Sequence, residues 1–174
     1  MAKNKVPVGL IDAEMYFNGS NNLAGIGEIE LPKIEIPTIP VEQFGMGGEL
    51  EVPLTGHFKK LEAKIKMNCI DETIADVTNE KSILIECKGA AQKMDKASQS
   101  PELYGIDATF KGLIKSIDGP KMKTGDKLEA AIDLSLTYYK LEINGKVILE
   151  IDILNNITNL HGVKNDAVRQ LMGL

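Results

Sequence analysis

The chain of 174 residues is poor in the residue types that most enzyme and metal sites need: it has two cysteines, two histidines and no tryptophan. Cys69 and Cys87 do not form a Cys-x-x-Cys pair, and a metal site requires several ligands at defined spacing. We interpret both as packed thiols, with a disulfide between them as the alternative. His57 and His161 stand apart from any nucleophile motif, so a catalytic triad is not indicated.

Signatures of acyl transfer and nucleotide binding are also missing. There is no Gly-x-Ser-x-Gly elbow and no Walker-type loop, and Gly25-Ile26-Gly27 lacks the third glycine of a dinucleotide fingerprint. Glu28 with Glu30, and Glu150 with Asp152, share strand faces, but a glycosidase pair comes from different strands and is not recognisable from local spacing. A solvated acidic face is the simpler interpretation. The sequence predicts no catalytic residue, no cofactor and no metal.

Long apolar runs and a cleavable leader are absent as well. No run approaches the ~18 apolar residues of a membrane-spanning helix, and Lys3 and Lys5 are followed by no uninterrupted apolar core. We therefore expect a cytoplasmic start and no direct membrane insertion. The net charge of −5 argues against a surface that grips nucleic acid, but it is compatible with one that nucleic acid slides past.

Alternation of apolar and polar residues is what the sequence does contain, most clearly from Leu128 to Tyr139. It predicts a strand with one buried face, because successive side chains of a strand point to opposite faces. The predicted apolar face carries Leu128, Ala130, Ile132, Leu134, Leu136 and Tyr138, and the other face carries Glu129, Ala131, Asp133, Ser135, Thr137 and Tyr139. A second run, with Val147, Leu149, Ile151 and Ile153 on one face, follows Asn144-Gly145. Asn-Gly between alternating runs predicts a hairpin, because a type I′ turn needs positive φ at both central residues.

Further strands are predicted along the rest of the chain. They cover Ala13–Phe17 before an Asn18-Gly19 turn, Leu23–Leu31, a long strand from Leu50 towards Asn68, Ser82–Cys87 and Tyr104–Ile117. The second half of the strand from Leu50 alternates regularly, which predicts a buried face and an outer face that is solvated or ionically paired. Residues 94–101 are expected to form a polar loop and residues 118–126 a turn-rich connection. The predicted fold is mainly β, an antiparallel sandwich or barrel, in a single domain over residues 1–174.

Two short helices are predicted beside the strands. Asp71 is a candidate cap for one helix, with Ile70, Ile74 and Val77 near helical spacing. The other spans Asn165–Leu171, with Asn165 as its cap.

Prolines and glycines interrupt the strand pattern between residues 32 and 48. Pro32, Pro37 and Pro40 cannot donate to a ladder, so this stretch is an edge strand or an extended arm. The following Phe44-Gly45-Met46-Gly47-Gly48 combines flexibility with apolar side chains that need a surface to cover. We expect a flexible arm around residues 37–50 that orders on contact with a neighbouring subunit. An anion-binding loop and a plain turn are the alternatives.

The C-terminal hairpin also resembles a known family. The stretches Tyr138–Lys146 and Leu149–Asn155 are similar to the end of the major tail tube proteins of contractile-tail bacteriophages, with an aromatic strand, a short Asn-Gly-Lys hairpin and a Glu-Ile-Asp strand. Further matches in the same order are Tyr16–Gly19, Glu30–Lys33, Gly45–Gly48, Gly162-Val163 and Gly173-Leu174. Residues 72–99 match poorly. The resemblance covers most of the chain, and related contractile bacteriocin particles share it.

The resemblance implies a structural role. Members of the family form hexameric rings that stack into the inner tube of the tail, and their strands join one ring-wide barrel around the lumen. It implies as partners further copies of the chain, the contractile sheath protein, and the tape-measure, baseplate and tail terminator proteins. DNA would pass through the lumen without specific binding. The location implied is the virion tail, assembled in the bacterial host cytoplasm.

An acidic subunit repeated around a ring would repel DNA phosphates and let the duplex slide. Alternating strand faces make six carboxylates candidates for the lumen wall: Glu28, Glu30, Glu129, Asp133, Glu150 and Asp152. The glycine-rich arm, Phe44 to Gly48, is the candidate for contact between subunits or rings. The alternatives are a small β-barrel module that binds a ligand or peptide, and the tube of a headless contractile bacteriocin.

Overall fold

The computed structural model describes residues 5–19, 26–42, 47–68, 80–164 and 167–173, and in these ranges the chain is built almost wholly from antiparallel strands. In chain order the elements are β1 (Lys5–Phe17), β2 (Ile26–Glu30), β3 (Thr38–Val41), β4 (Leu50–Pro53), β5 (Leu61–Met67), β6 (Ile83–Asp95), β7 (Pro101–Asp118), β8 (Ala130–Ile143), β9 (Lys146–Asp152), β10 (Ile157–Leu160), β11 (Val163–Lys164) and α2 (Ala167–Leu171). The predicted mainly β, antiparallel fold is confirmed.

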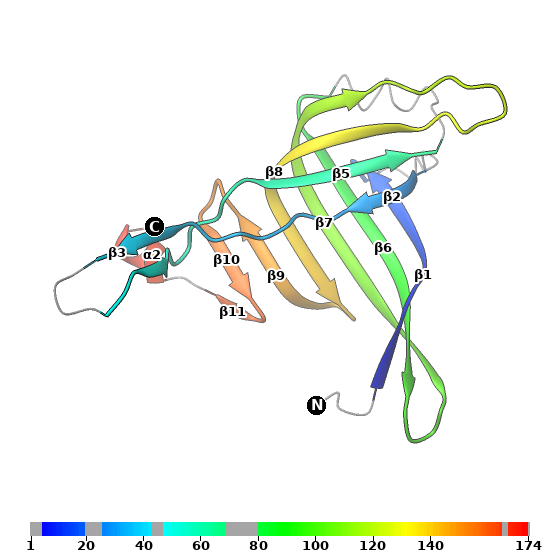
Figure 1. The fold of residues 1–174 in the computed structure, drawn as a ribbon. Helices are drawn as coiled ribbons and strands as arrows, with labels where there is room; N and C mark the ends of the chain where they lie inside the picture. Colours follow the sequence, from blue (N-terminus) through cyan, green and yellow to red (C-terminus); the bar gives the residue numbers. More distant parts are fainter. Residues whose placement is uncertain (1–4, 20–25, 43–46, 69–79, 165–166, 174) are drawn as a thin grey trace.

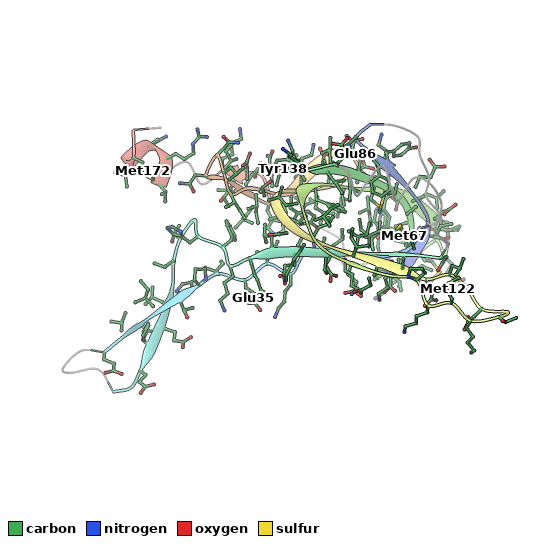
Figure 2. All side chains as sticks on the ribbon, turned by 90° about the horizontal axis from the view of Figure 1, so that it is seen from above. Glu35, Met67, Glu86, Met122, Tyr138 and Met172 are labelled. Atoms are coloured by element: carbon green, nitrogen blue, oxygen red, sulfur yellow. The ribbon has the colours of Figure 1, made fainter. Side chains whose placement is uncertain are left out.

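One sheet contains nine of the strands in the described residues. Its strands run in the order β1-β6-β7-β8-β9-β10-β11, while β5 pairs with β8 and β2 pairs with β5. The branch arises within β8, because residues Ala130–Leu136 pair with β5 and residues Tyr138–Ile143 pair with β9. Figure 2 shows the result: the sheet curls, so that β5 and the first half of β8 lie across from β6 and the first half of β7. Strands β1 and β2 are not paired with each other in the described residues, so the curl remains open between them.

The core lies between these two parts of the curled sheet. Every second residue of β5 is buried, namely Leu61, Ala63, Ile65 and Met67, as the sequence predicts. From the other strands the core receives Met15, Phe17, Ile83, Ile85, Ala108, Phe110, Ile132, Leu134, Leu136, Tyr139 and Ile151. Removing a large apolar side chain of this kind from water contributes about 1.5–3 kcal/mol, so this layer fixes which face of each strand points outward.

The alternation predicted for β8 fails after Leu136. The pairing with β7 shifts there, because Leu136 lies opposite Gly112 whereas Tyr138 lies opposite Lys111, which leaves Thr137 as an extra residue. The carbonyl oxygen of Thr137 accepts a hydrogen bond from the backbone N–H of Ile153 at 2.9 Å. Such a β-bulge reverses the faces beyond it. The prediction that Tyr138 shares the buried face is therefore wrong: Tyr139 is buried and Tyr138 turns outward.

Three turns in the described ranges have two successive residues of positive φ. Asn18-Gly19 and Asn144-Gly145 were both predicted, and φ is 48° and 74° in the first and 50° and 71° in the second. His161-Gly162, with φ of 53° and 82°, joins β10 to β11. These two strands were not predicted from the sequence, although His-Gly between short polar and apolar runs follows the same turn chemistry.

The long strand predicted from Leu50 to Asn68 is instead two strands. β4 ends at Pro53, and Gly56 in the intervening turn has a φ of 79°, which favours glycine. Among the described strands β4 pairs with β3 alone, and this two-stranded hairpin points away from the large sheet (Figure 1). Residues 31–37 form no ladder, as expected for an extended arm, whereas Pro40 lies in β3 at the edge of a two-stranded sheet, so each alternative describes one part of this stretch.

The remaining boundaries differ in detail. β6 and β7 extend to Asp95 and from Pro101, so the predicted loop at 94–101 is shorter than expected, while residues 119–129 form the predicted turn-rich connection. The C-terminal helix is present from Ala167 to Leu171, but its predicted cap at Asn165 lies outside the described residues. The helix predicted at Asp71, the residues Leu23–Gly25 of the second strand and Cys69 also lie outside them.

Candidate assembly surfaces

Three of the predicted lumen carboxylates lie on one outward face, formed by β2, β5 and the first half of β8, and each of them contacts a lysine. The ammonium group of Lys66 on β5 lies 2.9 Å from Glu28 and 2.7 Å from Glu30 on β2. On the other side of β5, Lys64 lies 3.3 Å from Asp133 on β8. These contacts follow from register, because cross-strand neighbours on one face of an antiparallel pair lie close together.

The ion pairs continue from β5 to β7. Glu62 accepts from Lys115 at 2.6 Å and lies 3.1 Å from Lys60. Lys64 also lies 3.5 Å from Asp118. At the root of the arm, Glu35 pairs with Lys33 and with Lys59. We call this surface the lattice face; its six carboxylates and six lysines are Glu28, Glu30, Glu35, Glu62, Asp118 and Asp133 with Lys33, Lys59, Lys60, Lys64, Lys66 and Lys115.

Positive and negative charges on the lattice face compensate one another, and the pKa values of three of its carboxyl groups are lowered. The hydrogen bond from Lys66 lowers the pKa of Glu30, and the bond from Lys115 lowers the pKa of Glu62. The hydroxyl of Ser116, which donates to Asp133 at 2.7 Å, is the main cause of a lowered pKa at that carboxyl, followed by Lys64. Of the two alternatives predicted for the outer face of β5, solvated or ionically paired, the structure shows the second.

The other candidates are placed differently. Glu150 and Asp152 lie on β9, on the outward face of the long strands. Glu150 accepts a hydrogen bond from the hydroxyl of Tyr138 at 3.1 Å. Burial, followed by the charge of Glu150, raises the pKa of Tyr138 to about 12. Glu129 precedes β8, is exposed, and lines a groove with Glu28 and Lys66 at the end of the lattice face.

The outward face of the long strands is acidic. We call it the acidic face and define it by the side chains that alternate with the core residues on β1, β6, β7, the second half of β8, and β9. Its charged members in these regular rows are Asp12, Glu14, Glu86, Asp107, Glu142, Glu150 and Asp152, with Lys88, Lys111 and Lys140. The seven carboxylates thus outnumber the three lysines by more than two to one. Figure 2 shows Glu86 and Tyr138 along one side of the molecule and Glu35 of the lattice face on the opposite side.

The β3–β4 hairpin presents apolar side chains to solvent. Ile39 and Val52 lie opposite each other in the hairpin and are 48% and 43% exposed, and Leu50 near its tip is 49% exposed. At its base the backbone N–H of Leu54 donates to the carbonyl of Pro37 at 2.9 Å. Of the predicted contact segment, Gly47 and Gly48 lie in open space, whereas Phe44, Gly45 and Met46 fall outside the described residues.

The two ends of the strand order β1 to β11 also expose apolar residues. Strand β1 has no partner on its outer edge in the described part of the chain, and Val8, Leu10 and Ile11 on it are each more than half exposed. At the opposite edge, Leu160 of β10 and Val163 of β11 are exposed. Unpaired apolar edges are a liability in a monomer and a means of joining in an assembly.

The described side chains that could bind a metal or act as a nucleophile do not cluster. Among the described residues no group of three or more histidine, cysteine, aspartate and glutamate side chains could hold a metal ion. Burial raises the pKa of the Cys87 thiol, which disfavours the reactive thiolate. In the same ranges no helix is long and apolar enough to cross a membrane.

The fold has counterparts in contractile injection machinery. A chain of the cryo-EM structure of an extracellular contractile injection system, the PVC sheath/tube terminator in the extended state, aligns with a TM-score of 0.53 at 14% identity, over 78% of this chain and 96% of that chain. A chain of the PVC sheath-tube complex in the extended state aligns with a TM-score of 0.51 at 12% identity, over 79% and 90% of the two chains. At these identities the likeness concerns the fold alone.

Sequence comparison gives the family. The model of phage tail tube protein FII matches residues 7–173. The chain is 27% identical over 169 residues to the major tail tube protein of Serratia phage KSP20, covering 92% of both. It is 24% identical over 153 residues to the tail tube protein of Escherichia phage P2, covering 86% of this chain and 87% of that protein. The chain belongs to the phage tail tube protein FII family, and it is a structural tail tube protein of contractile phage-like particles. The resemblance noted in the sequence is confirmed.

Proposed function

We propose that this protein self-assembles as stacked hexameric rings into the inner tube of a contractile tail, and that the tube is the conduit for DNA ejection. Membership of the tail tube family, over nearly the whole chain, is the observation that carries the proposal. The tube lies inside the contractile sheath protein and is closed by a tail terminator. Tape-measure and baseplate proteins are its further partners, and assembly takes place in the bacterial host cytoplasm.

The open edges of the large sheet support ring formation. In the proposed ring, the β1 edge of one subunit faces the β10–β11 edge of the next. A contact between two different surfaces of the subunit can repeat in this way until the ring closes. Such closure would cover Val8, Leu10 and Ile11 on one side and Leu160 and Val163 on the other, all of which are exposed in the isolated subunit. It would also remove the free strand edges.

The β3–β4 hairpin is the proposed contact to a neighbouring subunit or ring. In the part of the chain that the structure describes, it shares no ladder with the large sheet, and its apolar side chains Ile39, Leu50 and Val52 are exposed. The glycines at its tip, Gly47 and Gly48, leave room for close approach of another backbone.

The role is structural rather than enzymatic. The titratable groups with shifted pKa values lie mainly in ion pairs on open strand faces. An ion pair of this kind orders side chains but offers no converging nucleophile and base.

Electron microscopy of the purified protein at high concentration tests the proposal. We expect rings or tubes with a central channel, whereas a monodisperse small particle at every concentration would contradict it and favour a binding module. The fold likeness to an extracellular injection system also makes a headless particle a second candidate. Neighbouring genes separate the two: capsid and terminase genes indicate a DNA-carrying phage, and their absence a headless particle.

A further inference from the structure

Arg169 is the only arginine among the 20 lysine and arginine residues of the chain. It lies in α2, and its Nε is buried but has no hydrogen-bond partner among the described residues. Leaving a buried N–H without an acceptor costs free energy. An arginine also binds a carboxylate through two parallel hydrogen bonds, which a lysine cannot do. Arg169 therefore fits a carboxylate that another molecule supplies.

The helix around Arg169 packs little against its own subunit. None of the residues of α2 is buried, and Leu171 at its end is 90% exposed. Met172, the next residue, is 62% exposed. Its sulfur accepts a hydrogen bond from the side-chain amide of Asn156 at 3.8 Å, and a thioether is a weak acceptor. The C-terminal segment thus presents apolar side chains beside its arginine.

A groove of about 810 Å³ lies where the curled sheet is open, between β1 and β2. We call it the seam groove. Its apolar lining includes Leu10, Met15 and Ile29, and the carboxylate residues Asp12 and Glu14 of β1 also line it. Apolar lining with a few charged groups is typical of a surface that binds a partner.

Asp12 and Glu14 are open to a further cation. The donors to them are the backbone N–H of Ala13, 2.9 Å from Asp12, and the hydroxyl of Tyr16, 2.6 Å from Glu14. No lysine or arginine in the described ranges forms an ion pair with either carboxylate. Both differ in this respect from the carboxylates of the lattice face, each of which has a lysine partner.

The seam groove and α2 lie at opposite sides of the subunit (Figure 1). A contact between unlike surfaces repeats around a ring, so the contact that joins the β10–β11 end to β1 brings α2 to the next seam groove. Between Lys164 at the end of β11 and Ala167 at the start of α2 the chain spans at most about 11 Å. A neighbouring strand lies about 4.8 Å away. The helix is therefore within reach of the next subunit.

We propose that α2 of each subunit docks on the seam groove of the next copy, where Arg169 binds Asp12 or Glu14. Leu171 and Met172 then cover part of the apolar lining. The charges are complementary, which fixes the relative position of two copies more than it adds affinity. This inference rests on the proposed ring. It names the side chains that join neighbouring subunits beyond the backbone edges of the sheet.

A cryo-EM reconstruction of wild-type tubes, or of intact tails, gives the direct test. The expected map places the guanidinium of Arg169 within hydrogen-bond distance of a carboxylate of Asp12 or Glu14 in the adjacent subunit. A seam groove filled by residues 69–79 of the same subunit, or by the β3–β4 hairpin of another copy, overturns the inference but leaves the tube function intact. If no tube of this chain exists, the proposed function fails, and the inference fails with it.

Charge reversal provides a second test with a matched control. Arg169→Glu replaces an attractive pair by like charges, so the lowest protein concentration that gives rings or tubes should rise at least about tenfold. The control is Lys96→Glu, the same change of charge in the exposed turn after β6, and it should stay within about twofold of wild type. Circular dichroism checks that both variants fold. Wild-type assembly in the same experiment separates a failure of this inference from a failure of the proposed function.

Reversal of the partner should restore assembly. Arg169→Glu is combined with Asp12→Arg in one variant and with Glu14→Arg in another, and at least one of them should assemble within a few-fold of the wild-type concentration. Restoration by neither, or an equal effect of Arg169→Glu and Lys96→Glu, overturns the inference. If Arg169→Glu unfolds the subunit, Arg169→Gln is compared with Lys96→Gln, and equal assembly concentrations overturn it.

Discussion

Gly112 of β7 approaches the backbone of Ser135 on β8 so closely that a Cβ at Gly112 would lie 2.4 Å from the Ser135 carbonyl oxygen. The contact lies beside the bulge at Thr137, where the pairing of the two strands shifts. A backbone atom cannot move aside as the end of a flexible side chain can. The close approach is therefore part of the way in which β8 divides its pairing between β5 and β9.

Gly112→Ala is expected to destabilise the subunit by about 1–3 kcal/mol, the usual range for overpacking. The control is Gly105→Ala on the same strand, where a Cβ would meet nothing within 4 Å. We expect the control to change stability by less than about 0.5 kcal/mol. Urea unfolding followed by circular dichroism measures both, and equal midpoints for the two variants would contradict the register at the bulge.

The bulge also predicts which of two adjacent tyrosines contributes more to folding stability through burial in the core. Tyr139 is 3% exposed, so Tyr139→Ala should cost about 3–5 kcal/mol, as for other large aromatic side chains. Tyr138→Ala should cost less than half as much, because its ring lies on the outward face. The comparison is made by thermal or urea unfolding. The reverse ranking would restore the uninterrupted alternation that the sequence alone suggests.

Acid should weaken the lattice face. The pKa values of Glu30, Glu62 and Asp133 are lowered in the folded protein below their ordinary values of 4.5 and 3.8. A lowered folded pKa contributes stability above the ordinary value, and that stability is lost as the pH falls through the folded pKa. Melting temperature should therefore decline from about pH 5 downward. Lys66→Met should flatten this decline, whereas Lys96→Met, in the exposed turn after β6, should leave it unchanged.

Alkali acts on a different group. The pKa of Tyr138 is raised to about 12 from an ordinary 10.0, mainly by burial and then by Glu150. Because the folded protein holds this proton more tightly than the unfolded chain, the corresponding stability is lost as the pH rises from 10.0 towards 12. Titration of tyrosinate absorbance should show a late phase that becomes smaller in Tyr138→Phe, because the pKa values of Tyr139 and Tyr16 are raised as well. In Glu150→Gln this phase should move to lower pH, and an unmoved phase would contradict the contact with Glu150.

Polar substitution in the arm separates assembly from folding. Ile39→Asn with Val52→Asn should leave the melting temperature within a few degrees, since stability changes at exposed sites are usually within about 0.5 kcal/mol. Tube formation, followed by light scattering and electron microscopy, should be lost or shifted to much higher concentration. Thr38→Ser in the same hairpin is the control. Normal assembly of the Asn variant would exclude this hairpin as an essential contact.

Local chemistry predicted a large share of the fold. Asn18-Gly19 and Asn144-Gly145 specify their turns through backbone conformation. Leu61 to Met67 specify a buried face by strict alternation. Each of these features can therefore be predicted from a few neighbouring residues. The bulge at Thr137 is not, because it depends on how β8 pairs with β7 and β9 at once. The break between β4 and β5 was missed because alternation resumes on both sides of Gly56.

The charged surfaces likewise have features that local sequence predicts and features that depend on pairing between distant strands. An ionically paired outer face for β5 could be predicted because its lysines and Glu62 alternate with apolar residues in the sequence. The carboxylates that pair with these lysines could not be predicted, because Glu28, Asp133 and Asp118 belong to strands that are far away in the sequence. Glu28 and Glu150 therefore look equivalent in sequence, and only pairing across strands assigns them to opposite sides of the subunit.

Within the described ranges the β3–β4 hairpin shares no backbone ladder with the large sheet, so its residues are nearly independent of the core that stabilises the subunit. Natural variation can therefore alter the hairpin without a large loss of folding stability. Two tubes that share one host cell could in this way diverge in subunit compatibility while keeping the same channel. For engineering, the hairpin is the natural position at which to exchange sequence between related tubes and obtain subunits that assemble only with their own kind.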